Sequence, residues 1–291
     1  MDNFCEKNII ITGASGGIGR ELVLFFAKNG ANLILPVRNI SKGETLKNEV
    51  LALYPNAKIT LFEADLSSFS SIENFCELVL CPIDLVINAA GVYHIPKQKT
   101  ADGLLTEFAV NFAAPVFLSL KILPKMNKGG KIIAVSSISA DYFSPKADDL
   151  QGIGRSKTAA YGSSKFLLNS AFCFLDERLE IPFVLCHPGI SATSLFSPEK
   201  GGFGKLFNKI AVPLMRLIFP SPKKASQAVI FAALESSEKG YIAGAGDAFH
   251  VWGKPKFYKL KREFLNYSFL RSAVKEIKEK IAKTEFDIFE N

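Results

Sequence analysis

One stretch decides the fold: KNIIITGASGGIG, residues 7–19. Its first part, Lys7–Thr12, is β-branched and apolar, which predicts a buried strand, and the glycines after it predict a tight turn into a helix. Glycines at such a turn let the backbone approach a pyrophosphate, and the free N–H groups of the helix N-terminus attract its negative charge. The glycine spacing fits both GxxxGxG and GxxGxxG, so the string alone does not choose between the two patterns.

Beyond this stretch, short β-branched runs alternate with longer segments of helical periodicity. We predict strands at 7–12, 32–37, 58–63, 83–88, 131–136 and 182–187. We predict helices at 17–29, 41–53, 70–80, 104–126 and 158–179. Most of these strands are apolar on both faces, which is typical of a parallel sheet covered by helices on both sides. The expected fold is therefore α/β, with a doubly wound, Rossmann-type parallel sheet.

The chain is expected to form one domain with a short extension. Residues 1–252 are assigned to a dinucleotide-binding domain that includes a substrate lid at about 194–222, and residues 253–291 to a basic helical extension. In the extension, Phe269, Ala273, Ile277 and Ile281 recur as on an amphipathic helix. We favour packing of this helix against the domain surface.

Composition excludes several classes of protein. A chain of 291 residues with 48% hydrophobic and 22% charged residues can bury a sizeable core, which excludes wholesale disorder. No apolar run approaches the roughly 18 residues of a membrane span, and no secretory signal is visible at the start. The five cysteines include no CxxC motif, which favours a reducing compartment, and we expect a cytoplasmic protein. With only three histidines, no metal site is expected.

The net charge of +7 is concentrated in two regions, residues 200–224 and the tail. No groove-reading motif accompanies these lysines and arginines, so we expect no nucleic-acid partner. A basic face at the periphery of a membrane or around an anionic ligand fits better. A solvated lysine-rich surface is the simpler alternative.

The end of the second predicted strand bears on the choice of cofactor. A site for NAD would place Asp or Glu there to bind the ribose 2′-hydroxyl, but the sequence reads Val37-Arg38-Asn39. A guanidinium group suits a 2′-phosphate because it can donate two hydrogen bonds to it and neutralise its charge. The sequence therefore favours NADP over NAD, with an ordinary surface role for Arg38 as the alternative.

A Tyr-x-x-x-Lys pair can place both side chains on one helix face, where the lysine charge lowers the pKa of the tyrosine from about 10 towards neutrality. The pattern occurs four times in this sequence, and three of the four carry a proline between the partners, which argues against a helix. Only Tyr161 and Lys165 continue into a long apolar helical run. We therefore expect Tyr161 to be a general acid or base.

These motifs, taken together, resemble the classical short-chain dehydrogenase/reductase family over about residues 5–250. The resemblance rests on the glycine string, Asn88–Gly91, Val135-Ser136-Ser137, the Tyr161/Lys165 pair and Pro188-Gly189, in this order. The 24 positions from Ser137 to Tyr161 exceed the compact spacing typical of the family. That insertion, together with Val37-Arg38, resembles the retinol-dehydrogenase-like branch.

The resemblance implies roles for individual residues. Tyr161 would exchange a proton with the substrate oxygen, Lys165 would lower the tyrosine pKa and hold the nicotinamide ribose, Ser137 would bind the substrate oxygen, and Asn111 would support a relay water. It also favours GxxxGxG for the glycines. The implied cofactor-binding residues are Gly13, Ser15, Gly17, Ile18, Gly19, Arg38, Asn39, Asp65, Leu66, Asn88, Ala89, Gly91, Tyr161, Lys165, Ile190 and Thr193. His187, by contrast, is expected to pack or to cap a strand.

The resulting hypothesis is an NADP(H)-dependent oxidoreductase that moves hydride between nicotinamide and a carbonyl or alcohol. A stripe of apolar residues in the lid, Phe203, Phe207, Ile210, Leu214 and Leu217, favours a small lipophilic substrate. A homodimer is an expectation from the family alone. The alternatives are a non-catalytic NADP-binding sensor or scaffold and, less favoured, a sugar-nucleotide epimerase.

Overall fold

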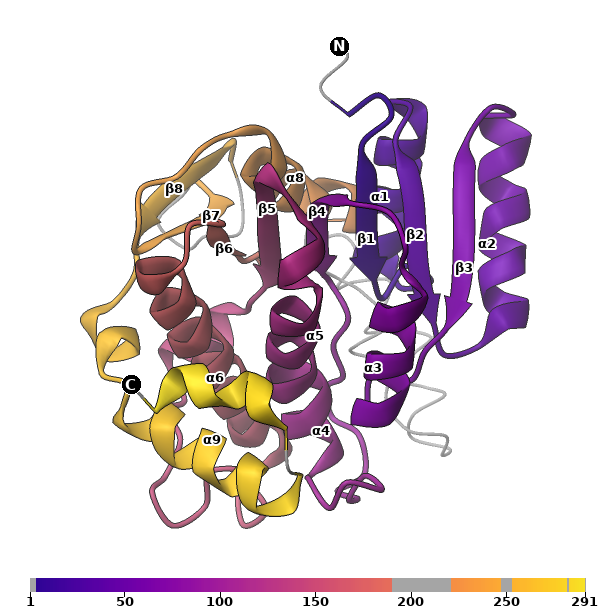
Figure 1. Ribbon diagram of the computed structural model, residues 1–291. Coiled ribbons are helices and arrows are strands. Elements are labelled where there is room, and N and C mark those ends of the chain that lie inside the picture. Colours follow the sequence, from indigo (N-terminus) through magenta and orange to yellow (C-terminus); the bar gives the residue numbers. More distant parts are fainter. Residues whose placement is uncertain (1–3, 190–220, 247–252, 282, 291) are drawn as a thin grey trace, which may run out of the picture.

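The computed structural model describes residues 4–189, 221–246, 253–281 and 283–290, and these residues build an α/β fold around one eight-stranded sheet (Figure 1). The strands are β1 (Asn8–Thr12), β2 (Asn32–Val37), β3 (Lys58–Glu63), β4 (Ile83–Asn88), β5 (Met126–Val135), β6 (Phe183–Cys186), β7 (Tyr241–Ala245) and β8 (Pro255–Lys259). Their order in the sheet is β3-β2-β1-β4-β5-β6-β7-β8, and only β8 pairs antiparallel. The predicted doubly wound parallel sheet is confirmed.

Helices cover both faces of the sheet. They are α1 (Gly17–Lys28), α2 (Ile40–Leu53), α3 (Phe69–Leu78), α4 (Thr106–Phe108), α5 (Ala114–Ile122), α6 (Lys157–Arg178), α8 (Pro222–Leu234) and α9 (Ser268–Lys280). Helices α3, α5 and α6 lie on one face and α1, α2 and α8 on the other, each set over its own apolar core (Figure 1). The chain leaves β1 in one direction and returns to β4 on its other side, and ligands of such sheets bind at this reversal, beyond the carboxyl ends of the strands.

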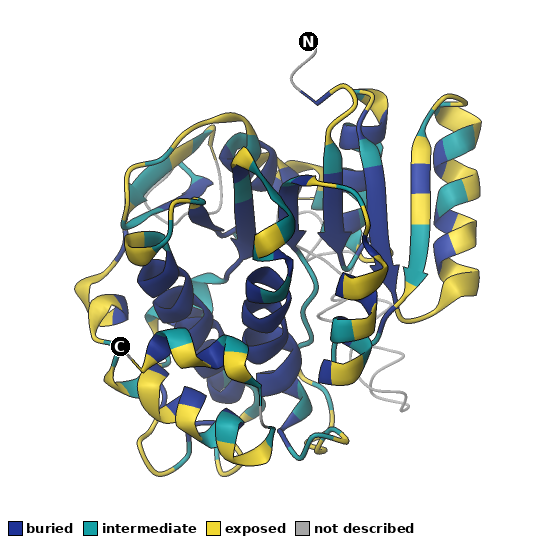
Figure 2. Cartoon of the chain, viewed as in Figure 1, coloured by how far each residue is buried: buried dark blue, intermediate teal, exposed yellow. Residues whose placement is uncertain are grey.

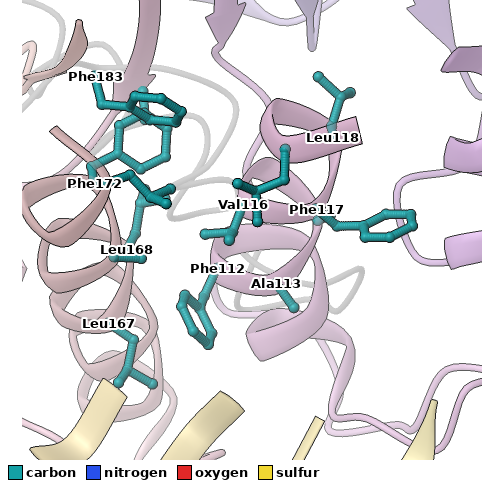
Figure 3. Close-up of a cluster of buried hydrophobic side chains, with 14 of the residues drawn as sticks. Phe112, Ala113, Val116, Phe117, Leu118, Leu167, Leu168, Phe172 and Phe183 are labelled. Atoms are coloured by element: carbon teal, nitrogen blue, oxygen red, sulfur yellow. The ribbon is translucent and has the colours of Figure 1, made fainter. Parts of the chain in front are cut away.

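The largest part of the core lies between α5 and α6. Phe112 and Val116 lie between the two helices, near Leu168 of α6 (Figure 3). The strands β1, β2, β4 and β6 and these two helices are largely buried, whereas β3 at the edge of the sheet is partly exposed (Figure 2). Burial on this scale anchors α6, the helix that carries Tyr161 and Lys165, because each buried large apolar side chain contributes roughly 1.5–3 kcal/mol.

Helix α5 belongs to a continuous helical stretch, Thr106–Lys125, that corrects one expectation. By length and composition alone this stretch is apolar enough to cross a membrane, whereas we expected no such stretch. However, 83% of it is buried inside the protein, as in the core helix of a folded domain. Its burial against α6 and the sheet therefore accounts for its apolar composition.

The C-terminal part of the chain differs most from the sequence prediction. The prediction omitted β7, β8 and α8, and residues 253–291 were expected to be helical, yet their first described element is the strand β8. Strand β8 begins with proline and carries two lysines, and small residues dominate β7, so neither carries a strong strand pattern. Helix α9 buries Ala273 and Ile277 and packs against α6, so the amphipathic tail covers the domain.

Candidate active site

The glycine-rich turn after β1 packs directly against the loop after β4. Gly13 has a φ of +68°, and a Cβ there would lie 2.7 Å from the Cα of Ala90. The Oγ1 atom of Thr12 accepts a hydrogen bond of 3.1 Å from the backbone N–H of Ala90. Only glycine fits at Gly13, because both the positive φ and the close approach exclude a side chain.

The N-terminus of α1 offers its N–H groups without a competing side chain. The N-cap is Gly16, which forms no side-chain hydrogen bond, and the first turn contains no acidic residue. Ser15 is exposed and Ile18 partly buried beside this end, and Gly17 begins the helix. Unpaired N–H groups at a helix N-terminus bind anions, so this end of α1 fits the pyrophosphate of a dinucleotide.

The residues assigned to the adenosine end lie beyond β2 and β3. Arg38 is exposed directly after β2 and forms no ion pair within the described part of the chain. The Oδ1 atom of Asn39 caps α2 by accepting a hydrogen bond from the N–H of Lys42 (2.9 Å). Asp65 is partly buried beside Leu66, and its Oδ1 accepts hydrogen bonds of 2.8 Å from Ser67. These side chains border one edge of the sheet, where a ribose phosphate would lie.

Asn88, at the end of β4, points into the protein. Its amide nitrogen donates to Ser119 Oγ at 3.0 Å, and the side chain is buried. This bond ties β4 to α5. The next residues along the chain, Ala89 and Gly91, are partly exposed, so the backbone after Asn88 is the part that can line a groove.

Asn111 occupies a π-helical turn (Ala109–Ala113) between α4 and α5 and is 0% exposed. Its side chain accepts from Val92 N–H and donates to Val92 C=O, each at 2.8 Å, and it also donates to Ser164 Oγ at 3.2 Å. A Cβ at Gly91 would lie 3.3 Å from Asn111 Oδ1 and 3.7 Å from Lys165 Nζ. The structure therefore brings Asn111 and Lys165 together at Gly91, and single π turns are frequent at functional sites.

Lys165 lies one turn after Tyr161 on α6, on the same helix face. Its side chain is 3% exposed, and Nζ donates to the carbonyl oxygen of Val135 at the end of β5 (2.8 Å). Burial lowers the pKa of Lys165 to about 8. A lysine in this environment exchanges protons close to physiological pH.

Ser137 lies beside Tyr161, and its hydroxyl acts on the pKa of Tyr161 by lowering it. Ser137 also accepts a hydrogen bond from the N–H of Ser139, which holds it at the start of a short 3-10 turn, η3 (Ile138–Asp141). Burial raises the pKa of Tyr161 to about 12, and Ser137 opposes this only in part. We expected Lys165 to lower this pKa towards neutrality; in the structure, burial is the largest effect and acts in the opposite direction.

The insertion between Ser137 and Tyr161 is fastened to the loop after β4. The ammonium group of Lys97 donates to the carbonyl oxygens of Gly152 (3.1 Å), Ile153 (2.5 Å) and Arg155. The Asp149 carboxylate accepts from the N–H groups of Ile153 and Gly154. The extra residues therefore form a compact turn fastened to the loop after β4.

Two neighbours of Tyr161 were missed by sequence reasoning. The ring of Tyr93 packs edge-on against that of Tyr161, with centroids 4.9 Å apart. Glu107 is only 5% exposed, and burial raises its pKa to about 7. A signal for Glu107 existed, since an acidic residue stands four positions before Asn111 inside an apolar helical run.

A cavity of about 110 Å³ opens beside Ser137. His187, which follows β6, lines it; the side chain is buried, hydrogen-bonds the hydroxyl of Tyr258, and accepts from Gly189 N–H at 3.3 Å through Nδ1. His187 thus packs at the strand end as the sequence suggested. Asn169 and Asp141 also line this cavity together with Ile138, Ile242 and Leu260, so its lining is mixed polar and apolar.

Some predicted residues lie outside the described residues. They are Ile190, Thr193 and the lid at about 194–222 with its apolar stripe, apart from residues 221 and 222. Within the part of the chain that the structure describes, no group of three or more His, Cys, Asp or Glu is placed to hold a metal ion.

Comparison of sequences adds independent information. The chain is 34% identical over 206 residues to the short-chain dehydrogenase TIC 32 B, chloroplastic, of Brassica napus, covering 64% of each chain. It is 30% identical over 239 residues to human retinol dehydrogenase 13, covering 78% of this chain and 72% of that protein. The match to the chloroplastic relative thus spans less than two thirds of that relative's length.

Solved structures share the fold. An uncharacterized protein from Mycobacterium paratuberculosis has a TM-score of 0.74 at 21% identity, covering 95% of this chain and 94% of that one. A short-chain dehydrogenase from Burkholderia cenocepacia in complex with NADP has a TM-score of 0.59 at 18% identity, covering 79% and 91%.

The family model for short chain dehydrogenase matches residues 7–200, which include β1 to β6 and all four residues Asn111, Ser137, Tyr161 and Lys165. With the fold, the glycine-rich turn and this constellation in agreement, the chain belongs to the short-chain dehydrogenase family.

Proposed function

We propose that this protein is an NADP(H)-dependent oxidoreductase that transfers hydride between nicotinamide and the carbonyl or alcohol carbon of a lipophilic substrate. The observation that carries the proposal is the buried ammonium of Lys165, which donates to the Val135 carbonyl at the end of β5 and lies one helical turn after Tyr161, with Ser137 beside Tyr161. These groups lie at the carboxyl end of β5, at the same edge of the sheet as the glycine-rich turn that follows β1. Such a group of side chains is suited to moving a proton at a substrate oxygen.

In the reducing direction, NADPH supplies the hydride to the carbonyl carbon when it is bound. The Tyr161 hydroxyl then gives its proton to the carbonyl oxygen, so that the carbonyl becomes an alcohol. The Ser137 hydroxyl donates a hydrogen bond to that oxygen as its negative charge develops. The Lys165 ammonium stabilises the phenolate left on Tyr161, and in the oxidising direction each proton moves the opposite way.

The preference for NADP is proposed from Arg38. Its guanidinium is exposed beyond β2, beside the groove that the glycine-rich turn and Asp65 border. A 2′-phosphate there gains two charge-assisted hydrogen bonds from a guanidinium. Four solved structures with this fold contain NADP or NADPH, which supports this choice at the level of the fold.

The lipophilic substrate is proposed from the lid sequence and from relatives named retinol dehydrogenase. The cavity beside Ser137 would accept part of the substrate, while the apolar stripe of the lid would cover the hydrocarbon part. A homodimer, a cytoplasmic location and peripheral contact with a membrane remain predictions. Sedimentation with anionic vesicles at low and high salt tests the membrane contact, because salt screens the attraction of basic residues.

A panel of carbonyls and alcohols, followed by NADPH absorbance, tests the proposed function. Turnover that disappears in Tyr161→Phe supports it. Tight NADPH binding without turnover of any compound would instead favour a non-catalytic sensor or scaffold. That alternative predicts that Tyr161→Phe changes nothing measurable.

A further inference from the structure

Glu107 is a buried acid that the proposed reaction does not use. It lies in the short helical turn α4, four positions before Asn111, and its side chain is 5% exposed. One carboxylate oxygen, Oε1, is buried without a hydrogen-bond partner. A buried carboxylate of this kind is costly and needs an explanation, because burying a charged or polar atom without a partner loses its hydration.

The surroundings of Glu107 connect it to Tyr161. The backbone N–H of His94 donates to the Glu107 carboxylate, and the preceding residue, Tyr93, packs its ring against Tyr161. Helix α4 also packs directly against α6, the helix that carries Tyr161. The carboxylate therefore lies in the wall of the site, behind the Tyr93–His94 segment.

Two cations act on this carboxylate. Lys97 and Lys157 act on Glu107 from the loop after β4 and from α6, and both favour its charged form. The ammonium of Lys97 is held by carbonyl groups of the insertion, and that of Lys157 donates to the His94 carbonyl at 3.3 Å. Tyr161 is also within reach of the Glu107 charge, which raises its pKa. Burial outweighs both lysines, because it raises the pKa of Glu107 to about 7.

The electrostatic effect of Glu107 on Tyr161 has a definite sign. A negative charge near a phenol disfavours the phenolate, and Glu107 is one of the groups that raise the pKa of Tyr161. The effect is present only when Glu107 is ionised. It is absent below the pH at which the carboxyl takes up its proton.

We propose that Glu107 is a positioning residue whose negative charge keeps the Tyr161 hydroxyl protonated and so favours reduction of a carbonyl over oxidation of an alcohol. This inference rests on the proposed function. Reduction needs a proton on Tyr161, whereas oxidation needs the phenolate to accept one. A charged Glu107 carboxylate extends the pH range in which Tyr161 is protonated, and it shortens the range in which Tyr161 is a phenolate.

The pH dependence of kcat/KM in Glu107→Gln tests this role in the full-length protein with NADP(H). In the wild type, the rate of reduction should fall and the rate of oxidation should rise as the pH becomes alkaline. In Glu107→Gln we expect both changes to occur at a pH lower by about half to one unit. At a fixed pH on this alkaline limb, that shift is a threefold to tenfold change in kcat/KM. Glu107→Asp keeps the charge and should restore the wild-type position of both limbs. Asp148→Asn removes an equally negative but exposed charge from the insertion and should leave them in place.

A second measurement does not depend on turnover. In protein labelled with ¹³C at tyrosine Cζ, the resonance that disappears in Tyr161→Phe reports ionisation of Tyr161. In Glu107→Gln this resonance should move towards phenolate at lower pH than in the wild type. An unchanged Tyr161 titration would overturn the inference, as would coincident rate profiles. A protein without turnover but with the expected resonance shift would contradict only the proposed function.

Discussion

The ammonium nitrogen of Lys165 lies 2.8 Å from the carbonyl oxygen of Val135, in the interior of the protein. This bond joins α6 to the carboxyl end of β5, where Ser136 and Ser137 follow. Ser136 Oγ, in turn, is 2.5 Å from Asn169 Oδ1, one turn further along α6. Two successive turns of α6 thus hold the end of β5, which sets the position of Ser137 relative to Tyr161.

Replacing Lys165 tests the cost of burying its charge. Its pKa is about 8 in the folded protein and 10.5 in the unfolded chain, so the unfolded state binds more protons between these values. The free energy of unfolding of the wild type should therefore rise by roughly 3 kcal/mol from pH 8 to 10.5, relative to Lys165→Met. Chemical denaturation of both proteins across this range measures the difference. A difference that does not vary with pH would mean that Lys165 is solvated.

Replacing Tyr161 tests the acid–base assignment. Tyr161→Phe should lower kcat by about 10²–10⁴-fold, because the phenol is needed for proton transfer. Cofactor affinity should change little, because the ring still fills its place against Tyr93. The matched control is Tyr93→Phe, which keeps the ring contact with Tyr161 and should retain most of the activity. Comparable losses in both variants would contradict the assignment.

Replacing Arg38 tests the cofactor preference. The wild type should bind NADPH at least about tenfold more tightly than NADH, a difference of roughly 1.4 kcal/mol, and Arg38→Ala should remove this preference. Titration of both cofactors into both proteins measures it. Arg262→Ala removes another exposed arginine, from the η5 turn (Arg262–Leu265), and should change neither affinity. Equal affinities in the wild type would refute the role of Arg38.

Replacing Glu107 should also change the pH dependence of stability. The pKa of this carboxyl is about 7 in the folded protein and 4.5 in the unfolded chain, so the folded state binds the proton more tightly. The stability gained from this proton is complete below pH 4.5 and is lost as the pH rises to 7, by roughly 3 kcal/mol. Relative to the wild type, Glu107→Gln should therefore gain stability across this window, as measured by denaturant unfolding at several pH values. Parallel curves would show that Glu107 is ionised throughout.

The length of the substrate chain tests the lid. Each buried methylene should contribute about 0.8 kcal/mol, so four extra carbons should raise kcat/KM by roughly two orders of magnitude. A homologous series of aldehydes or ketones, assayed with NADPH, measures this dependence. A flat profile would contradict an apolar pocket, and a maximum at short chains would point to the small cavity beside Ser137 as the whole binding site.

Local sequence patterns were sufficient for the framework of this protein. The strands β2, β3 and β4 match the predicted ranges residue for residue. This agreement arises because strands and helices differ in the spacing of their apolar residues, and that spacing can be read from the sequence. The glycine string identified the turn after β1, and the i, i+4 spacing of Tyr161 and Lys165 placed both on one helix face. The strands β7 and β8 were not predicted, because their sequences have no clear strand pattern. They are held in the sheet by the pairing of β7 with β6 and of β8 with β7.

Only the tertiary structure decided the environment of each site residue. Tyr161 lies beside Ser137 although 24 positions separate them in the sequence. Asn111 hydrogen-bonds Val92 and Ser164, which are also distant from it in the sequence. The pKa values of Tyr161, Lys165 and Glu107 depend on burial, and burial depends on which distant segments pack together. A sequence motif states which groups are present and how they are spaced locally. The loss of hydration that sets their chemistry arises only when α4, α6 and the loop after β4 close around them.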